Sequence, residues 1–298
     1  MLTFHTLDVF TSRPYAGNPL AVVLGADALT PAQMQRIARE FNLSETIFVQ
    51  PPRDPANTAR VRIFFPTAEI PFAGHPTIGC AVLLASQAAP EGDFTKEIRL
   101  EEEAGLVPVT VTRRGARTEA ELIAPVLPHA HSGRVSKDLA ARALGLAAED
   151  IGLRQHRPGV WAGGPAFLYL PIRDRACLAR ARPHEPHWSE LLATAEVDSA
   201  YLYTDGHGSD FQARMFSPTA GIPEDPATGS ASAILAAQLN AAGLIPAGTN
   251  RFSLQQGVEM GRPSQIALTV TAEAGAITEV RIGGSAVPIS EGRLNPPD

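Results

Sequence analysis

Short apolar runs, separated by Gly, Pro and Asp, follow one another along most of this 298-residue chain. Residues 3–10 alternate between apolar and polar side chains, which is typical of a strand with one buried face. Such runs predict a protein built mainly of strands. In the first half we expect strands at residues 3–10, 20–24, 46–49, 59–65, 97–101, 107–112 and 119–124.

Two helices interrupt these strands. The first has a clear start, since Thr30 is a typical N-cap, Pro31 suits the first helical position and Gln33 can complete a capping box. A second helix is predicted at residues 75–85, which are apolar on all sides and therefore expected to be buried. The apolar face of the first helix has helical spacing and consists of Met34, Ile37, Ala38 and Phe41.

The second half repeats this order of elements. Residues 125–134 contain two prolines, a glycine and few apolar side chains, and are the best candidate for a linker between the halves. Beyond them, a helix at residues 136–144 ends at Gly145, and an Ala-rich helix is expected at residues 227–242. Strands are predicted at residues 166–171, 199–204, 211–216, 251–255, 265–271, 277–282 and 286–290.

A sequence repeat supports a duplicated domain. Residues 64–71, Phe-Phe-Pro-Thr-Ala-Glu-Ile-Pro, correspond to residues 216–223, Phe-Ser-Pro-Thr-Ala-Gly-Ile-Pro. The same register pairs Ala-Val-Leu at 81–83 with Ala-Ile-Leu at 233–235. Both segments predict a strand, a Pro-Thr-Ala turn, a loop of small residues and a buried helix. We therefore expect two similar halves related by a pseudo-two-fold axis.

In each half, a loop of small residues opens the buried helix. These loops are Phe-Ala-Gly-His-Pro-Thr-Ile-Gly at 72–79 and Glu-Asp-Pro-Ala-Thr-Gly-Ser-Ala at 224–231. The first N–H groups of a helix lack partners within it and carry its positive dipole end, so they can bind a small carboxylate. The alternative is a pair of capped helix starts without further function, for which Asp225 and Thr228 are well suited. His75 in one loop and Asp225 in the other favour a site.

Glu45 is the second feature of interest. It lies in Asn42-Leu43-Ser44-Glu45-Thr46, between the end of a helix and an apolar strand. Its carboxylate would lie at the mouth of that strand. A solvated turn glutamate is the simpler alternative, since most glutamates are exposed.

Composition and charge exclude several classes of function. The formal net charge is −6 and no basic run occurs, which argues against a nucleic-acid surface. The two cysteines, Cys80 and Cys177, lie far apart and outside any CxxC pattern, which fits a reducing cytoplasm. No signal peptide or membrane span is recognisable, so a soluble cytoplasmic protein is expected. No phosphate-binding or dinucleotide fingerprint occurs, so no cofactor is implied.

Several conspicuous side chains are interpreted as structural. The pairs His129 and His131, and His184 and His187, lie in Pro-rich, loop-like stretches without a nearby third ligand, and no metal site is expected there. Glu101-Glu102-Glu103 is interpreted as a solvated strand end. The two tryptophans are interpreted as packing residues because no basic groove accompanies them. They are Trp161 and Trp188.

Four short motifs together resemble the signature blocks of the PhzF-like family of phenazine-biosynthesis isomerases. They occur in the family's order and are Gly17-Asn18-Pro19, Asn42-Leu43-Ser44-Glu45-Thr46, Ala73-Gly74-His75-Pro76-Thr77 and Asp225-Pro226-Ala227-Thr228-Gly229-Ser230-Ala231. The resemblance runs through the whole chain to residues 282–287. It implies an α+β fold of the diaminopimelate-epimerase type, in which two pseudo-symmetric domains each wrap a barrel-like, mostly antiparallel sheet around a central helix. The C-terminal strand of this fold returns to the first domain, so the expected halves are residues 1–124 with 284–298, and residues 125–283.

The resemblance also implies roles for single residues. Glu45 matches the catalytic glutamate of the family, and His75 and Asp225 match polar pocket residues that we count with the catalytic group. Gly74 and Gly229 match positions where backbone amides hold the substrate carboxylate. The full set expected to bind substrate is Asn18, Ser44, Gly74, Thr77, Gly229 and Ser230.

These residues predict a proton-transfer enzyme. Related epimerases and proline racemases place a cysteine at each helix N-terminus, whereas these loops carry none and Cys80 falls within the helix. Glu45, with a pKa raised by apolar neighbours such as Ile47 and Phe48, would take a proton and return it elsewhere on a small carboxylate-bearing substrate. The expected protein is a cofactor-independent, homodimeric isomerase. Two alternatives stay open: an amino-acid epimerase or racemase with Asp225 or His75 as a second base, and a catalytically silent small-molecule binding protein.

Overall fold

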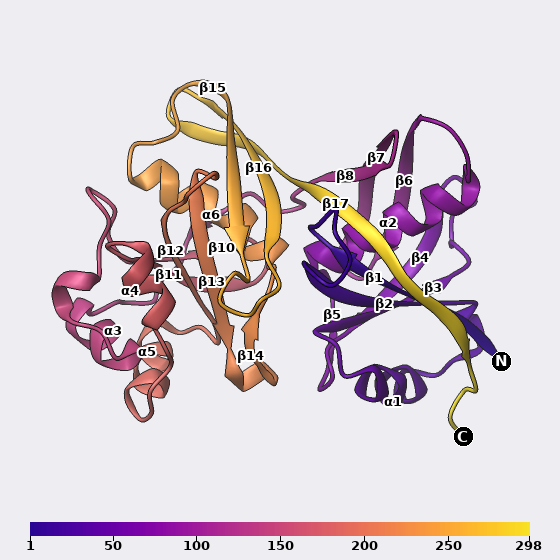
Figure 1. Cartoon of the computed structure of the whole chain (residues 1–298), viewed down its shortest axis with the longest axis horizontal. Coiled ribbons are helices and arrows are strands. Elements are labelled where there is room, and N and C mark those ends of the chain that lie inside the picture. The colour runs from indigo at the N-terminus through magenta and orange to yellow at the C-terminus, as the bar shows by residue number, and fades with distance from the viewer. The chain divides into compact units, whose positions relative to one another are not determined.

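The computed structural model describes residues 1–298, except the side chain of Ala220, a member of the repeated motif at 216–223 that lies outside the described part. Two compact units make up the chain (Figure 1). Unit 1 contains Met1–Pro125 and Gly283–Asp298, and unit 2 contains Val126–Ile282. The prediction from sequence had placed these boundaries at 124/125 and 283/284.

Unit 1 is a ring of strands around one helix. Its strands are β1 (Leu2–Val9), β2 (Asn18–Leu24), β3 (Glu45–Gln50), β4 (Ala59–Phe64), β5 (Glu69–Ile70), β6 (Phe94–Glu102), β7 (Gly105–Arg114), β8 (Arg117–Ile123) and the end of β17 (Ala276–Leu294). Neighbours pair in the order β17, β1, β2, β3, β4, β6, β7, β8, and β8 pairs again with β17. The β2–β3 and β4–β6 pairs are parallel. Eight strands therefore close into a mostly antiparallel barrel.

The helix inside this barrel is α2 (Gly74–Ala88), which contacts β1, β2, β3, β6, β7 and β8. Residues 74–83 of α2 are all buried, as expected for a helix without a polar face. Outside the barrel, α1 (Pro31–Phe41) packs its Met34, Ile37 and Ala38 against Phe48 and Phe64. The capping box between Thr30 and Gln33 is confirmed.

Unit 2 repeats the arrangement but contains more helices than unit 1. The strands are β9 (His129–Ala130), β10 (Gly159–Ala162), β11 (Ala166–Pro171), β12 (Ala200–Asp205), β13 (Phe211–Ser217), β14 (Ile222–Asp225), β15 (Gly248–Gln256), β16 (Ser264–Glu273) and the beginning of β17. Pairing runs β9, β10, β11, β12, β13, β15, β16, β17, with β14 beside β13. The central helix is α6 (Gly229–Ala241), which contacts β9, β10, β11 and β16.

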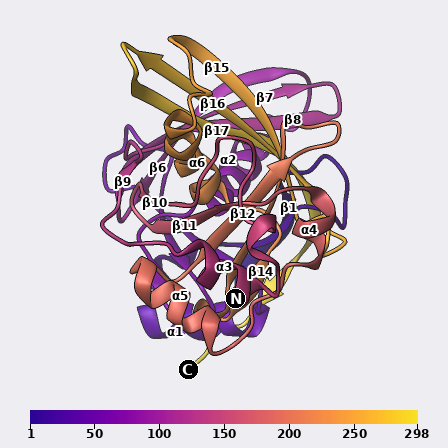
Figure 2. The same cartoon turned by 90° about the vertical axis from the view of Figure 1, so that its left-hand side faces the viewer.

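Three further helices gather at one end of unit 2 (Figure 2). They are α3 (Lys137–Leu144), α4 (Arg175–Arg180) and α5 (His187–Ala195), and they share a core with Leu168, Leu202 and Phe216. Short 3-10 turns complete the chain at Ala26–Ala28, Ala148–Asp150 and Pro218–Ala220. None of the described helices is long and apolar enough to span a membrane.

The sequence prediction missed α4 and α5. Residues 184–187 were assigned to a loop, but His187 is the first residue of α5. The signal was present, because Trp188, Leu191, Leu192 and Ala195 recur at helical spacing and are buried. Pro183 and Pro186 precede these residues and are typical of a loop.

The two predicted strands at residues 277–282 and 286–290 are one strand, β17. The Gly283-Gly284 pair lies between the two predicted ranges. A Cβ on Gly283 would lie 3.1 Å from the carbonyl oxygen of Ala120 on β8. The glycine therefore permits close approach of the neighbouring backbone and does not end the strand.

A matching close approach on α2 gives a stability prediction. A Cβ on Gly79 would lie 2.5 Å from Leu20 Cδ2 and 2.7 Å from Val9 Cγ2. Gly79→Ala should therefore lower the free energy of unfolding by about 1–3 kcal/mol through overpacking, although Ala favours helices. Denaturant unfolding checks this against Ser86→Ala on the same helix, which should change stability by less than about 0.5 kcal/mol. A stabilised Gly79→Ala variant would contradict the prediction.

Candidate active site

Three predicted residues of unit 1 come together at the N-terminus of α2. Asn18 is the first residue of β2, Glu45 is the first residue of β3, and His75 is the second residue of α2. Because β2 and β3 are parallel neighbours, their first residues lie at the same edge of the barrel. The closed ring thus places an amide, a carboxyl group and an imidazole side by side.

His75 bridges the other two residues. Its Nδ1 lies 3.3 Å from Asn18 Nδ2, and its Nε2 lies 3.3 Å from Glu45 Oε2. All three side chains are buried: the side chains of His75 and Glu45 are 3% and 9% exposed, and Asn18 is fully covered. A buried glutamate at this position excludes the alternative of a solvated turn residue.

The imidazole of His75 is neutral at physiological pH. Desolvation by burial lowers the pKa of His75 to about 3. Since the amide of Asn18 donates to Nδ1, the ring proton is on Nε2 and faces the Glu45 carboxyl group. A neutral His75 can orient Glu45 without forming a fixed ion pair with it.

Thr77 has a role inside unit 1. Its Oγ1 lies 2.7 Å from the carbonyl oxygen of Ala73 and 2.6 Å from Glu102 Oε1. Glu102 is buried, whereas the sequence prediction had placed it in a solvated strand end; that assignment was wrong for this residue. Strand alternation explains the error, because β6 directs Glu101 outward and Glu102 toward α2.

The residues predicted in unit 2 lie at the start of α6. Asp225 ends β14, and its Oδ2 accepts a hydrogen bond of 2.5 Å from Thr228 Oγ1. Gln256, which the sequence analysis missed, donates from Nε2 to the Asp225 carbonyl at 2.8 Å and to Thr228 Oγ1 at 3.0 Å. Gly229 and Ser230 are the first two residues of the helix.

The predicted residues divide between the units. Asn18, Ser44, Glu45, Gly74, His75 and Thr77 belong to unit 1, and Asp225, Gly229 and Ser230 belong to unit 2. The N-cap residue is Ala73 in α2 and Thr228 in α6. Neither side chain makes a capping hydrogen bond to the first turn of its helix. The N–H groups of both first turns are thus not taken by a capping side chain. A shared cleft between the units stays a prediction.

A buried arginine fixes the segment that carries Asp225. Arg214 on β13 is 1% exposed and makes a two-pronged ion pair with Glu224, at 2.7 Å and 2.8 Å. Its remaining Nη1 donates to the carbonyls of Leu178 and Ala181 at the end of α4. Glu224 directly precedes Asp225, so this fork anchors the strand from which the Asp225 side chain projects.

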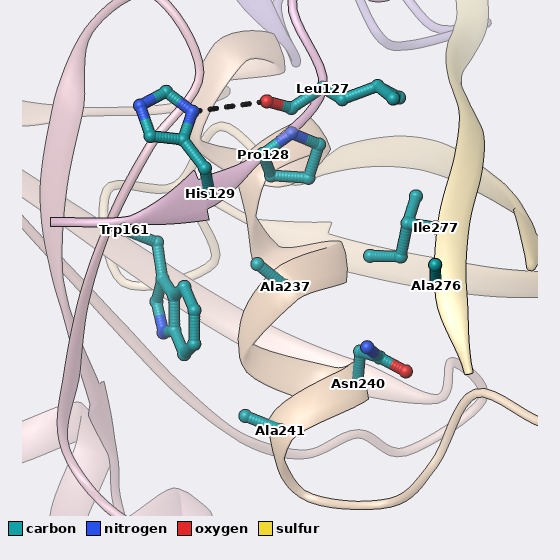
Figure 3. A pocket seen from close by; sticks show the side chains of 9 residues that line it. All are labelled: Leu127, Pro128, His129, Trp161, Ala237, Asn240, Ala241, Ala276 and Ile277. Carbon is teal, nitrogen blue, oxygen red and sulfur yellow. Dashed lines mark hydrogen bonds between the residues drawn. The ribbon is translucent and has the colours of Figure 1, made fainter.

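The described residues also form a pocket in unit 2, away from these clusters. It measures about 480 Å³ and lies between β9, the beginning of β17 and the second half of α6 (Figure 3). Trp161 forms one wall and Ala237 part of the floor, while His129 turns toward the carbonyl of Leu127. No predicted site residue lines it, and its lining is mostly apolar. Among the described residues, no group of three His, Cys, Asp or Glu side chains could hold a metal ion.

The repeated sheet around a buried central helix, with polar residues gathered at the helix N-terminus, defines an α+β protein with the diaminopimelate-epimerase-like fold. Solved structures support this class. A phenazine biosynthesis protein of the PhzF family from Bacillus anthracis matches with a TM-score of 0.87 at 24% identity, over 99% of both chains. A probable proline racemase from Agrobacterium radiobacter matches with a TM-score of 0.68 at 15% identity, over 99% of this chain and 93% of that one.

Sequence comparison then gives the family. Residues 7–292 match the family model described as phenazine biosynthesis-like protein. An uncharacterized isomerase of Mesorhizobium japonicum is 41% identical over 96% of each chain. The trans-2,3-dihydro-3-hydroxyanthranilate isomerase of Pseudomonas aeruginosa is 34% identical over 98% of this chain and 99% of its own length. The chain belongs to the phenazine biosynthesis-like (PhzF-like) family and is an enzyme of the isomerase class.

The burial of His75 predicts a specific acid sensitivity. Its folded pKa of about 3 lies below the unfolded value of 6.5, so the unfolded state binds more protons between these values. The contribution of the neutral His75 to the free energy of unfolding is fully present above pH 6.5 and is lost as the pH falls toward 3. Relative to His75→Gln, the wild-type free energy of unfolding should fall by up to about 1.4 kcal/mol per pH unit in this window. A free energy of unfolding that depends on pH in the same way in both proteins would contradict the prediction.

Loss of the buried Arg214–Glu224 ion pair should lower the stability of the protein markedly. Arg214→Met leaves Glu224 without its partner and three helix-end carbonyls without a donor, so the free energy of unfolding should fall by about 3–5 kcal/mol. Arg154→Met removes an exposed ion pair with Asp205 in the same unit and should cost at most about 1 kcal/mol. Denaturant unfolding of both variants measures the difference, and equal losses would disprove a special role for Arg214.

Proposed function

We propose that the protein is a cofactor-independent isomerase in which Glu45 moves a proton on a small carboxylate-bearing substrate. The observation that carries the proposal is the buried Glu45 carboxyl group held against a neutral His75 at 3.3 Å. A general base needs a fixed position and a partner that does not neutralise it permanently. The names of the curated relatives support the class of reaction.

The proposed reaction is an allylic proton shift. The Glu45 carboxylate removes a proton from a substrate carbon, and the electron pair of the broken C–H bond forms a new double bond. The electrons of the original double bond then take the proton back from Glu45 at the far carbon. Glu45 ends as a carboxylate, and the substrate keeps its composition and charge.

His75 has the role of orienting Glu45 in this scheme. With a pKa of about 3, the imidazole does not compete for the proton that Glu45 carries. Its Nε2–H faces Glu45 Oε2 and so orients the carboxyl group. Asn18 fixes the tautomer through Nδ1. The proton on Glu45 is thereby kept for return to the substrate.

The carboxylate of the substrate is assigned to the helix N-termini. The first-turn N–H groups around Gly74 in unit 1 and those around Gly229 in unit 2 are the groups proposed to hold it. Asp225, with Ser230 beside the same turn, would orient the rest of the substrate. Because the Pseudomonas aeruginosa relative is named for a dihydro-hydroxyanthranilate, small cyclic amino or hydroxy carboxylates are the proposed substrate class. The homodimer and the cytoplasmic location stay predictions.

The cysteines disfavour a two-thiol racemase. Burial, reinforced by the nearby Glu102 carboxyl group, raises the pKa of the Cys80 thiol, and this residue lies in the second turn of α2. Cys177 is buried within α4. Neither thiol lies at the helix starts where the proposed substrate binds. An epimerase would therefore require a carboxyl or imidazole second base.

Deuterium incorporation tests the proposal. A panel of cyclic and amino-acid carboxylates, including the dihydro-hydroxyanthranilate and proline derivatives, is incubated with enzyme in deuterated water and analysed by NMR and mass spectrometry. Glu45→Gln should lose about 10²–10⁴-fold in exchange rate on the responding compound, since it cannot accept the proton. Glu91→Gln, an exposed glutamate of the same unit, is the matched control and should retain the wild-type rate.

The pattern of exchange separates the alternatives. Deuterium at a new position with a shifted double bond supports the isomerase. Exchange at a single Cα with inversion would instead indicate an epimerase. Exchange that survives Glu45→Gln would remove Glu45 from the mechanism, and binding without any exchange would favour a silent binding protein.

A further inference from the structure

Glu102 is the buried carboxyl group that the proposed reaction does not use. It is the last residue of β6, is 8% exposed, and meets Thr77 on α2. Thr77 lies two residues beyond His75, in the first part of the same helix. Whatever holds Thr77 therefore also holds the turn that presents His75.

The hydrogen-bond geometry fixes the protonation state of Glu102. Thr77 Oγ1 lies 2.7 Å from the Ala73 carbonyl oxygen and 2.6 Å from Glu102 Oε1, both within the range of a hydrogen bond. A threonine hydroxyl has a single proton, and a carbonyl oxygen only accepts. Both contacts are satisfied when Thr77 donates to Ala73 and a protonated Glu102 donates to Thr77.

Unit 2 contains a comparable relay built with an amide, in which the threonine is the N-cap of the helix and not a residue of its first turn. Gln256 is the last residue of β15, just as Glu102 is the last residue of β6, and both strands have nine residues. β15 pairs in parallel with β13 and antiparallel with β16, and β6 pairs in parallel with β4 and antiparallel with β7. Gln256 Nε2 donates to Thr228 Oγ1 at 3.0 Å, and Thr228 Oγ1 donates to Asp225 Oδ2. The internal repeat thus places a permanent neutral donor at the position that Glu102 occupies in unit 1.

We infer that Glu102 is a protonated, neutral hydrogen-bond donor that fixes the first turn of α2 through Thr77, and is thereby a positioning residue for His75. The inference does not depend on the proposed reaction, because it concerns the structure of unit 1 alone. Desolvation by burial raises the pKa of Glu102 to about 8. The carboxyl group is therefore mainly protonated at neutral pH.

The charged and titratable neighbours leave this state undisturbed. On α2, the buried thiol of Cys80 has a raised pKa and is protonated, and His75 is neutral above about pH 3. On β4, Arg60 pairs with Glu101 and so lies on the opposite face of the sheet from Glu102. On β7, Gly105 is opposite Glu102, and the arginines of that strand lie at its other end, at 113 and 114.

Glu102→Gln tests the inference because glutamine keeps the shape and the donor but does not titrate. The wild-type folded pKa of about 8 lies above the ordinary 4.5, so the folded state binds more protons between these values and wild-type stability falls as pH rises through them. Relative to Glu102→Gln, the wild-type Tm should therefore fall by roughly 2 °C per pH unit in this window and level off above it. Infrared difference spectra near neutral pH should show a protonated carboxyl band in the wild type that the variant lacks.

Glu101→Gln is the matched control on the same strand. Hydrogen bonds from the Asn57 side chain and from the backbone of Asp54 and Arg53 lower the pKa of the half-buried Glu101 to about 2, so this carboxylate is ionised throughout the window. Glu101→Gln should leave the protonated carboxyl band in place, and its Tm should differ from the wild type by a constant amount across the window. A Tm difference that varies with pH would contradict the assignment to Glu102.

Glu102→Leu tests the positioning role, because it keeps the volume but removes the donor. The Thr77 amide hydrogen is bonded to the Ala73 carbonyl. Its exchange, measured against the rest of α2, should accelerate at least tenfold in this variant and return to the wild-type rate in Glu102→Gln. Absence of the protonated carboxyl band, together with a Tm difference between wild type and Glu102→Gln that does not change with pH, would overturn the inference. Unchanged exchange of the Thr77 amide in Glu102→Leu would overturn the positioning role.

Discussion

The enclosure of an apolar helix by a closed ring of strands is the constraint on which the rest of unit 1 depends. α2 has no polar face, so it is stable only where strands cover it on all sides. The ring meets this need through β17, which joins β8 to β1. Covering the helix also covers its N-terminus, so any polar residue placed there is buried and must find a partner within the protein.

That burial explains the chemistry at the helix start. A histidine in water titrates near neutrality, but His75 is held neutral because the barrel removes the solvent that would stabilise its charge. The same desolvation raises the pKa of Glu102. One physical cause thus shifts the pKa of a base downward and that of an acid upward, and in both cases favours the uncharged form. A site with few competing proton carriers suits the role proposed for Glu45, which is to return the proton that it removes.

The two units meet the same need with different side chains. In unit 2 the helix start is tied by Gln256, Thr228 and Asp225, and the strand before it is anchored by the buried Arg214 fork. In unit 1 the corresponding tie runs through Glu102, Thr77 and a backbone carbonyl. Both units connect the last residue of a strand to a helix start through a threonine, but the threonines occupy different positions relative to the helix.

The sequence by itself determined the elements and the candidate residues whose signals are local. The capping box at Thr30, the apolar character of residues 75–85 and the repeated Phe-x-Pro-Thr-Ala motif each depend on neighbours in the chain, and each corresponds to an element of the structure. Glu45, His75 and Asn18 were named from short motifs. Spacing along the chain could not show that His75 lies between the other two, because they come from separate strands and a helix.

Only the tertiary structure decided which side chains are buried together. Glu102 belongs to a run of three glutamates that is typical of a solvated strand end, and Gln256 has no motif at all. Both are functional candidates because strand alternation directs them at the start of a helix far away in sequence. Gly283-Gly284 likewise looks like a break until the approach of the β8 backbone shows why the side chain is absent. Packing between distant segments determines which side chains are buried, and burial in turn shifts their pKa values. The local pattern of residues therefore predicts neither the burial nor the pKa.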